Sequence, residues 1–328
     1  MTNDNNAHPY ELLTPDCVLS AIEQQDYCPN GSLLALNSYE NRVYQVGLDD
    51  NSFIIAKFYR PERWTNEAIE EEHQFTFELA EQEIPVVAPL KQNNKSLFEY
   101  NGFRFALYPR QGGRAPELDN AETLRQLGRL LGRIHATGAQ HPFQHRPRLT
   151  IESFGYSSLK FLLEHNFIAP ELKHNYQQAA NEALDIIEQR FEAVIPRNIR
   201  LHGDCHPGNI LWTDKGAHFV DLDDSRSGPA VQDLWMLLSG TTVEMEQQFR
   251  LLLEGYQMFF EFDPAELVLI ESLRTLRLIH YSAWLARRWN DPAFPQHFPW
   301  FNTPRYWEDQ MLTLREQIER LESPPIKL

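Results

Sequence analysis

Residues 201–224 read LHGDCHPGNILWTDKGAHFVDLDD, and this stretch decides how the rest of the chain is interpreted. A polar loop carries Asp204 and Asn209, and an apolar strand then leads to Asp221 and Asp223. Apolar residues flank the loop on both sides, which is typical of short strands around a turn. We therefore expect two short strands that bring these polar side chains together at one opening of the fold.

Three of these side chains have the chemistry that phosphoryl transfer from a metal-bound nucleotide needs. Asp204 would accept the proton of the acceptor hydroxyl as the catalytic base. Asn209 lies five residues later and Asp221 a further twelve; both would hold Mg2+ against the phosphates, because this hard cation prefers oxygen ligands. The spacing predicts a phosphotransferase with Asp204 and Asp221 as catalytic residues, Asn209 and Asp221 as metal ligands, and ATP as co-substrate.

The stretch allows two other interpretations. An isolated Asp or Asn in a loop is more often a turn cap than a ligand, but the joint spacing between apolar strands disfavours that explanation here. A zinc site is the second alternative, and the chain contains no CxxC pair that would support it. Its candidate ligands are His202, Cys205, His206 and His218. We expect His202 to be a hydrogen-bonded structural residue instead.

The order HGDxHPGN, followed by two apolar residues and Asp-x-Asp, resembles the catalytic and metal loops of the aminoglycoside phosphotransferase and choline kinase branch of the protein-kinase-like superfamily. Further segments are similar to the bacterial stress response kinase A (RdoA-like) group: LNSYENRVYQ, KFYRPERWT, EEHQF, HGDCHPGNILW, FVDLDD and GPAVQDLWMLL. The resemblance covers roughly residues 33–290. It implies an ATP- and Mg2+-dependent serine/threonine protein kinase of the stress response, with protein substrates.

The resemblance also implies an α+β, bilobal, protein-kinase-like fold. A small N-lobe over 33–109, with an antiparallel sheet plus one helix, would cover the nucleotide. It follows an N-terminal helical extension over 1–32. The Pro- and Gly-rich residues 110–116 read as the hinge. A larger, mainly helical C-lobe over 117–328 would supply the catalytic loop and the acceptor side.

Three residues of the N-lobe are candidates for the nucleotide site. Lys57 ends an apolar strand, where an ammonium group needs an anion unless it snorkels to solvent. Glu72 falls within the apolar face of the helix predicted after Thr65, so we assign Glu72, rather than Glu70 or Glu71, as its partner. The resemblance implies that Lys57 contacts the α- and β-phosphates. Ser38 is the candidate contact in the loop that lacks the GxGxxG glycines, although an ordinary polar turn is the alternative.

Local patterns predict the remaining elements. Thr14-Pro15-Asp16 indicates the start of a helix, and Asp119-x-x-Glu122 resembles a capping box before another. We expect hairpins from strands 42–48 with 52–59 and from strands 96–100 with 103–108, the second around Asn101-Gly102. Residues 141–160 are expected to be irregular and 170–194 helical. The last third should be helical, with the aromatic residues of 289–307 in its core.

The segment after Asp221 sets further expectations. Only eleven residues separate Asp221 from Asp233, too few for a long activation segment with a phosphosite. Asp233 resembles the family's buried helix aspartate that braces the catalytic loop. Asp223 could be a second metal contact or a charge near the acceptor, and Asp224 is expected to be solvated. Cys205 is interpreted as an inert loop cysteine, with a redox-sensitive thiol as the alternative.

Composition bounds the classes of function. The 328 residues carry a net charge of −16, which argues against nucleic acid or an anionic membrane as the main partner. The three cysteines cannot all pair, and no apolar run approaches the roughly 18 residues that span a bilayer. We expect a compact, reduced, cytoplasmic protein that acts as a monomer.

Two alternative functions stay open at this point. The acidic balance suits a kinase of a cationic small molecule such as an amino alcohol, a sugar derivative or an aminoglycoside. A catalytically silent nucleotide-sensing module is the second alternative, which the full set of catalytic residues disfavours. The identity of the acceptor is not defined by any motif.

Overall fold

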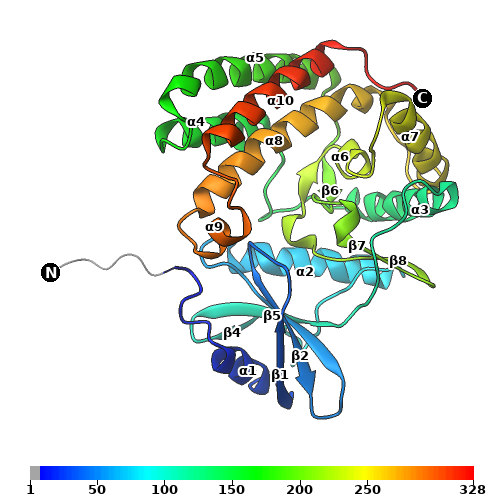
Figure 1. Ribbon diagram of the computed structural model, residues 1–328. Helices are drawn as coiled ribbons and strands as arrows, with labels where there is room; N and C mark the ends of the chain where they lie inside the picture. The colour runs from blue at the N-terminus through cyan, green and yellow to red at the C-terminus, as the bar shows by residue number, and fades with distance from the viewer. Residues whose placement is uncertain (1–7) are drawn as a thin grey trace. The chain divides into compact units, whose positions relative to one another are not determined.

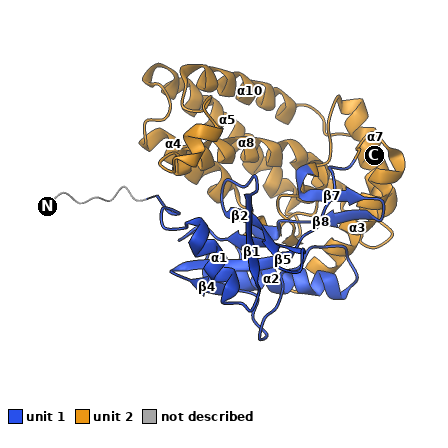
Figure 2. Ribbon diagram, turned by 60° about the horizontal axis from the view of Figure 1, so that its bottom comes forward, with its two compact units in different colours: residues 1–116, 144–146, 208–223 blue, residues 117–143, 147–207, 224–328 orange. Residues whose placement is uncertain are grey.

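The computed structural model describes residues 8–328, which form two compact units (Figures 1 and 2). Unit 1 consists of the chain up to Pro116 with Gln144–Arg146 and Gly208–Asp223. Unit 2 consists of Glu117–Phe143, Pro147–Pro207 and Asp224–Leu328. The first segment of unit 1 therefore ends at the last residue of the predicted hinge. Among the described residues, no helix combines the length and the apolar character needed to cross a membrane.

A five-stranded antiparallel sheet in the order β1-β2-β3-β5-β4 forms the centre of unit 1. The two predicted hairpins are present, and Asn101 and Gly102 both adopt positive φ in the second turn, as a tight hairpin requires. Strand β1 was not predicted. The strands are β1 Pro29–Ala35, β2 Arg42–Leu48, β3 Phe53–Phe58, β4 Phe98–Tyr100 and β5 Phe103–Pro109.

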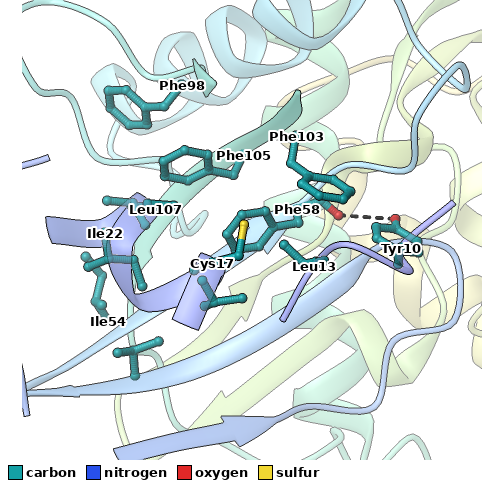
Figure 3. Packing of buried hydrophobic residues seen from close by; sticks show 14 of the residues in the cluster. Tyr10, Leu13, Cys17, Ile22, Ile54, Phe58, Phe98, Phe103, Phe105 and Leu107 are labelled. Atoms are coloured by element: carbon teal, nitrogen blue, oxygen red, sulfur yellow. Dashed lines mark hydrogen bonds between the residues drawn. The ribbon is translucent and has the colours of Figure 1, made fainter. Parts of the chain in front are cut away.

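Helix α1 (Pro15–Glu23) covers one face of this sheet (Figure 3). Thr14 caps it by accepting a hydrogen bond from the backbone N–H of Cys17. Its buried side chains share one hydrophobic core with strand residues such as Phe58 and Phe105. The Tyr10 hydroxyl, just before the helix, donates to the backbone carbonyl of Phe58 at 3.3 Å. The described part of the N-terminal extension is therefore built into the sheet core.

Helix α2 (Asn66–Glu81) packs with residues of the opposite face of the sheet. Thr65 is its N-cap, as predicted, and its buried stripe includes Ala68, Ile69, Glu72, Phe75 and Leu79. Ile69 belongs to a small cluster with Tyr59 and Ala106. Because successive strand side chains alternate between faces, Lys57 points away from the core that holds its neighbours Ala56 and Phe58.

A second hairpin of unit 1 consists of β7 (Ile210–Thr213) and β8 (Gly216–Phe219). Its outer edges pair with two other segments of the unit. Arg114 of the predicted hinge exchanges two backbone hydrogen bonds with Trp212, and Val86 forms a parallel bridge with Phe219. The hairpin is thereby fixed in place, and the predicted site residues Asn209 and Asp221 flank its two strands at the open end.

Unit 2 is mainly helical, with one two-stranded sheet of β6 (Ile199–Leu201) and β9 (Arg226–Gly228). Helices α3 and α7 pack closely because Gly128 has no side chain. A Cβ at this position would lie only 2.0 Å from the carbonyl oxygen of Leu252. The helices are α3 Ala121–Gly138, α4 Ser157–Glu164, α5 Pro170–Val194, α6 Val231–Trp235, α7 Thr242–Tyr256, α8 Leu269–Arg288, α9 Ala293–His297 and α10 Pro304–Glu322. Short 3-10 turns cover Pro207–Asn209, Leu222–Asp224 and Pro264–Val268.

The predicted α+β class, with a small antiparallel-sheet part and a helical part, is confirmed. Two local expectations were wrong. Asn120, not Asp119, caps α3, because its side chain accepts from the N–H groups of Glu122 and Thr123. Residues 141–160 are not irregular throughout, since a π-helical turn at Glu152–Tyr156 runs into α4. Most of the aromatic side chains of 289–307 are buried, as expected for core residues.

Candidate active site

Asn209 and Asp221 lie together at the open end of the β7–β8 hairpin. Ile210 pairs with Phe219 in the ladder, and the N–H of Val220 donates to the carbonyl of Asn209 at 3.0 Å. Asp221 follows directly, with 54% of its side chain exposed and a positive φ of 58°. The short strands predicted from the sequence therefore bring the two candidate metal ligands to one place.

This pair of oxygen donors fits Mg2+. The cation binds proteins through one or two carboxylates and takes its other ligands from nucleotide phosphates and water. The exposed carboxylate of Asp221 leaves room for such ligands. Between residues 8 and 328, no cluster of three or more His, Cys, Asp or Glu side chains has metal-binding geometry. Of the residues of the zinc alternative, His202, Cys205 and His206 lie in unit 2 and form no such cluster there.

Lys57 reaches this pair from β3. Its Nζ lies 2.8 Å from Oδ1 of Asp221 and 3.4 Å from Oδ1 of Asp223, and its side chain is buried. Burial alone would lower the pKa of the ammonium group, but Asp221, Asp223 and Glu72 together raise it well above its usual value. Lys57 is therefore a permanently charged cation beside the candidate metal ligands.

The structure does not form the predicted ion pair between Lys57 and Glu72. Glu72 is buried on α2, and within the described chain its Oε2 accepts no hydrogen bond. Burial raises the pKa of Glu72 to about 7, an effect that the Lys57 charge opposes. Glu72 is thus near enough to influence Lys57, but Asp221 holds the ammonium group. Ser38 lies half-buried in the loop between β1 and β2, and its nucleotide contact stays a prediction.

Asp223 is an anchor that the sequence left ambiguous. Its carboxylate is buried and accepts hydrogen bonds from Asn41, at 3.1 Å, and from the guanidinium of Arg63. Asn41 in turn accepts the backbone N–H of Arg60. These partners lie in the LNSYENR and KFYRPERW segments, where only Ser38 and Lys57 had been assigned roles. Asn41 and Arg63 were missed because nothing in their spacing points to a carboxylate about 160–180 residues later.

In unit 2, Asp233 braces the loop that carries Asp204, as expected. Its carboxylate accepts the backbone N–H groups of His202 and Gly203, both at 2.9 Å, and contacts Nε2 of His135 at 3.1 Å. Burial would raise the pKa of Asp233, but the interactions with His135, His202 and the Gly203 amide lower it below its usual value. Gly203 needs its positive φ, and a Cβ there would lie 2.2 Å from the carbonyl oxygen of Asp224.

The carboxylate of Asp204 is partly exposed and faces a cation from α8. Oδ1 lies 2.6 Å from Nη1 of Arg277, and Oδ2 lies 3.6 Å from Nε2 of His206. Sequence reasoning gave Arg277 no role.

Asp224 is not simply solvated, since it forms an ion pair with Arg226 at 2.6 Å.

Cys205 is buried within the same loop. Burial, followed by the charges of Asp233 and Asp204, raises the pKa of its thiol well above the usual value. The thiolate is therefore disfavoured, which supports the interpretation of Cys205 as an inert cysteine.

The fold is similar to that of two solved kinases. The chain superposes with a TM-score of 0.69 and 19% identity on amicoumacin kinase hAmiN in complex with AMP-PNP and Ca2+, with 94% of each chain covered. The TM-score is 0.60, at 11% identity, for a choline kinase from Cryptosporidium parvum, covering 94% of this chain and 96% of the other. At these identities the likeness shows the fold, and it confirms the predicted kinase-like class.

Sequence comparison is more specific. The model of the phosphotransferase enzyme family matches residues 32–269. Stress response kinase A of Escherichia coli strain K12 is 45% identical over 325 residues, which is 99% of this chain and 98% of the relative. Serine/threonine protein kinase RdoA of Salmonella typhimurium strain LT2 is 43% identical over the same coverage. The chain therefore belongs to the phosphotransferase enzyme family and, within it, to the stress response kinase A group.

Proposed function

We propose that this protein is an ATP- and Mg2+-dependent protein kinase that phosphorylates serine and threonine hydroxyls. The observation that carries the proposal is the meeting of Asn209 and Asp221 at the end of one hairpin, with the buried cation of Lys57 on Asp221. Oxygen ligands for a metal ion and a cation for the phosphates are the groups that bind a nucleoside triphosphate and its metal. The names of the relatives at 43–45% identity support both the protein acceptor and a role in the stress response.

Asn209 and Asp221 would hold the metal ion. When bound, Mg2+ would neutralise charge on the phosphates as the γ-phosphoryl group is transferred. Lys57 would contact the α- and β-phosphates, for which its ammonium group has to leave Asp221. Glu72 is the carboxylate that could then balance Lys57 from α2, the role the sequence assigned to it. Ser38 is proposed as a further nucleotide contact from the β1–β2 loop.

Asp204 would act as the base. Its carboxylate takes the proton of the acceptor hydroxyl as the new O–P bond forms, and the bond between the γ-phosphorus and the bridging oxygen of ATP breaks to release ADP. Asp233 contributes indirectly, because its bonds to the His202 and Gly203 amides fix the backbone just before Asp204. A general base positioned in this way accelerates the reaction about 10²- to 10⁴-fold.

The test is protein phosphorylation with radiolabelled ATP and Mg2+, a generic protein acceptor and Asp204→Ala as control, followed by phosphoamino-acid analysis. Phosphoserine or phosphothreonine that disappears in the variant is the expected result. No protein label, together with transfer to a panel of small alcohols, would instead establish a small-molecule kinase. ATP binding without any transfer would identify a nucleotide sensor.

A further inference from the structure

Three consecutive glutamates on α2 point in three directions. Successive helix residues are about 100° apart, so Glu70 is exposed, Glu72 is buried beside Lys57, and Glu71 lies between these two environments. The carboxylate of Glu71 accepts three backbone hydrogen bonds, from the N–H groups of Gln144, His145 and Arg146, at 2.6, 2.8 and 2.8 Å. None of these contacts involves the nucleotide-site residues assigned above.

Three successive amides that converge on one anion form a tight binding arrangement. Hydrogen bonds to an ionised acceptor are shorter and stronger than neutral ones, and consecutive N–H groups can line an anion-binding concavity. Here the anion belongs to the chain itself. Gln144–Arg146 is an isolated piece of unit 1 between two segments of unit 2. Glu71 therefore fixes the backbone of a short segment that has no helix or strand to hold it.

The ordered segment delivers Arg146 to the metal-binding region. The Arg146 side chain is buried, and its Nη2 donates to the backbone carbonyl of Asp223. Its guanidinium carbon lies 4.1 Å from the ring centroid of Trp64, a cation–π contact. Arg104 in turn donates to the Trp64 carbonyl at 2.6 Å. A buried guanidinium needs such fixed partners, so its position depends on the backbone that Glu71 holds.

The segment that Arg146 holds is strained. Asp221 has a φ of 58°, in the left-handed region that side chains with a Cβ rarely adopt. Conformations of this kind persist when the surroundings over-determine them. Asp223 is fixed twice, through its carboxylate by Asn41 and Arg63 and through its carbonyl by Arg146. The carbonyl contact is the one that acts on the backbone two residues beyond Asp221.

We propose that Glu71 and Arg146 form a clamp that holds Asp221–Asp223 in its metal-binding conformation. Both are positioning residues, since the contacts that carry the proposal are with backbone groups and with the Trp64 ring. The metal part of this inference rests on the proposed function, which assigns Asp221 to Mg2+. The order held by the clamp in the metal-free protein does not depend on that assignment.

Glu71→Gln is the informative variant. The amide keeps the length of the side chain, but it removes the charge and puts an NH2 group against backbone donors. Glu70→Gln makes the same chemical change on the adjacent, exposed position of α2 and is the matched control. Arg146→Lys is the second variant, because lysine keeps the charge and loses the planar guanidinium that reaches the Asp223 carbonyl.

The first measurement is hydrogen–deuterium exchange of the metal-free, full-length protein. In Glu71→Gln we expect exchange in residues 219–226 to accelerate about ten-fold relative to the wild type and to Glu70→Gln. Exchange in α7 should not change. The second measurement is Mn2+ binding, followed by electron paramagnetic resonance in the presence of a non-hydrolysable ATP analogue. The affinity should fall about ten-fold in Glu71→Gln and in Arg146→Lys, and should be unchanged in Glu70→Gln.

Each outcome has a defined meaning. Equal exchange of 219–226 in Glu71→Gln and Glu70→Gln would overturn the clamp, as would faster exchange throughout the chain, α7 included. If Glu71→Gln does not fold, the same comparison in Arg146→Lys decides. Asp221→Asn separates the two proposals: if it binds Mn2+ like the wild type, the metal assignment fails, and the exchange of 219–226 still tests the clamp.

Discussion

Nη1 of Arg277 lies 2.6 Å from Oδ1 of Asp204, so the candidate base carries a cation on one of its two carboxylate oxygens. The contact comes from α8, two turns into the helix, and from a loop whose backbone is fixed by Asp233. Both side chains are partly exposed, at 39% and 21%. Solvent screening therefore limits the strength of the pair. We therefore expect Arg277 to orient the Asp204 carboxylate.

Replacement of Arg277 should have a small and selective effect. Because exposed ion pairs contribute about 0.2–1 kcal/mol, we expect Arg277→Gln to lower kcat/KM for the acceptor about two- to five-fold, and KM for ATP not to change. Steady-state kinetics with either substrate varied will measure this. Arg277→Lys keeps the charge and serves as control. A loss as complete as that of an Asp204 variant would mean that Arg277 takes part in the chemistry.

Asp204→Asn should separate binding from turnover. The amide has nearly the same shape but cannot accept the acceptor proton, so we expect kcat to fall by about 10³-fold. Nucleotide affinity, measured by calorimetric titration with a non-hydrolysable ATP analogue and Mg2+, should stay within about two-fold of the wild type. Near-normal transfer by the variant would show that another group acts as the base.

Asp223→Asn tests the charge network beside the candidate metal ligands. The side chain is 4% exposed. Its carboxylate accepts a hydrogen bond from Asn41 and forms ion pairs with Arg63 and Lys57. Removal of one charge from a buried network leaves its cations uncompensated, so the free energy of unfolding should fall by about 3 kcal/mol. Urea unfolding curves will measure the change, with Asp214→Asn in the exposed β7–β8 turn as control. A decrease no larger than that of the control would show that Asp223 is not an anchor.

Glu266 should make stability depend on pH. Burial raises its pKa from 4.5 to about 7, although its carboxylate accepts the N–H of Val231 at 2.9 Å. The folded state then binds the proton more tightly than the unfolded state. This contribution is complete below about pH 4.5 and is lost as the pH rises through about 7. At about 1.4 kcal/mol per pKa unit, the loss is on the order of 3 kcal/mol.

Glu266→Gln, which resembles the protonated acid, should remove this part of the dependence. The free energy of unfolding of the variant should fall less between pH 5 and 7 than that of the wild type, as measured by urea unfolding across this interval. Glu261→Gln, at an exposed position nearby in sequence, is the control. Parallel pH profiles of the wild type and Glu266→Gln would contradict the raised pKa.

The sequence predicted the parts of the site that depend on local spacing. Asn209 and Asp221 flank a run of apolar residues with a turn in its middle, so their meeting at one end of a hairpin follows from strand pairing alone. Lys57 and Glu72 were placed correctly on strand and helix. Their ion pair is not formed in this structure, where Asp221, 164 residues beyond Lys57, holds the ammonium group, and periodicity could not predict that contact.

Other features leave no side-chain pattern in the sequence. Glu71 binds backbone amides 73 to 75 residues away, and amides are the same whatever residue carries them. Strand β1 is exposed or half-buried along its length and shifts register between Pro29 and Leu33, so it has no alternation of apolar and polar residues. Arg277 could not be linked to Asp204, because the two residues are far apart in sequence and only the tertiary packing of α8 brings them together.

The burial of Cys205 gives the protein a built-in reporter. Among the cysteines, Cys28 is exposed, whereas Cys17 and Cys205 are buried, and burial raises the pKa of both buried thiols. A thiol-reactive dye should therefore label Cys28 in the native protein and reach Cys205 when the loop around Asp204 opens. Electrophilic reagents aimed at Cys205, beside the proposed base, should be poor inhibitors. The labelling rate of Cys205 should measure local opening of the loop around Asp204.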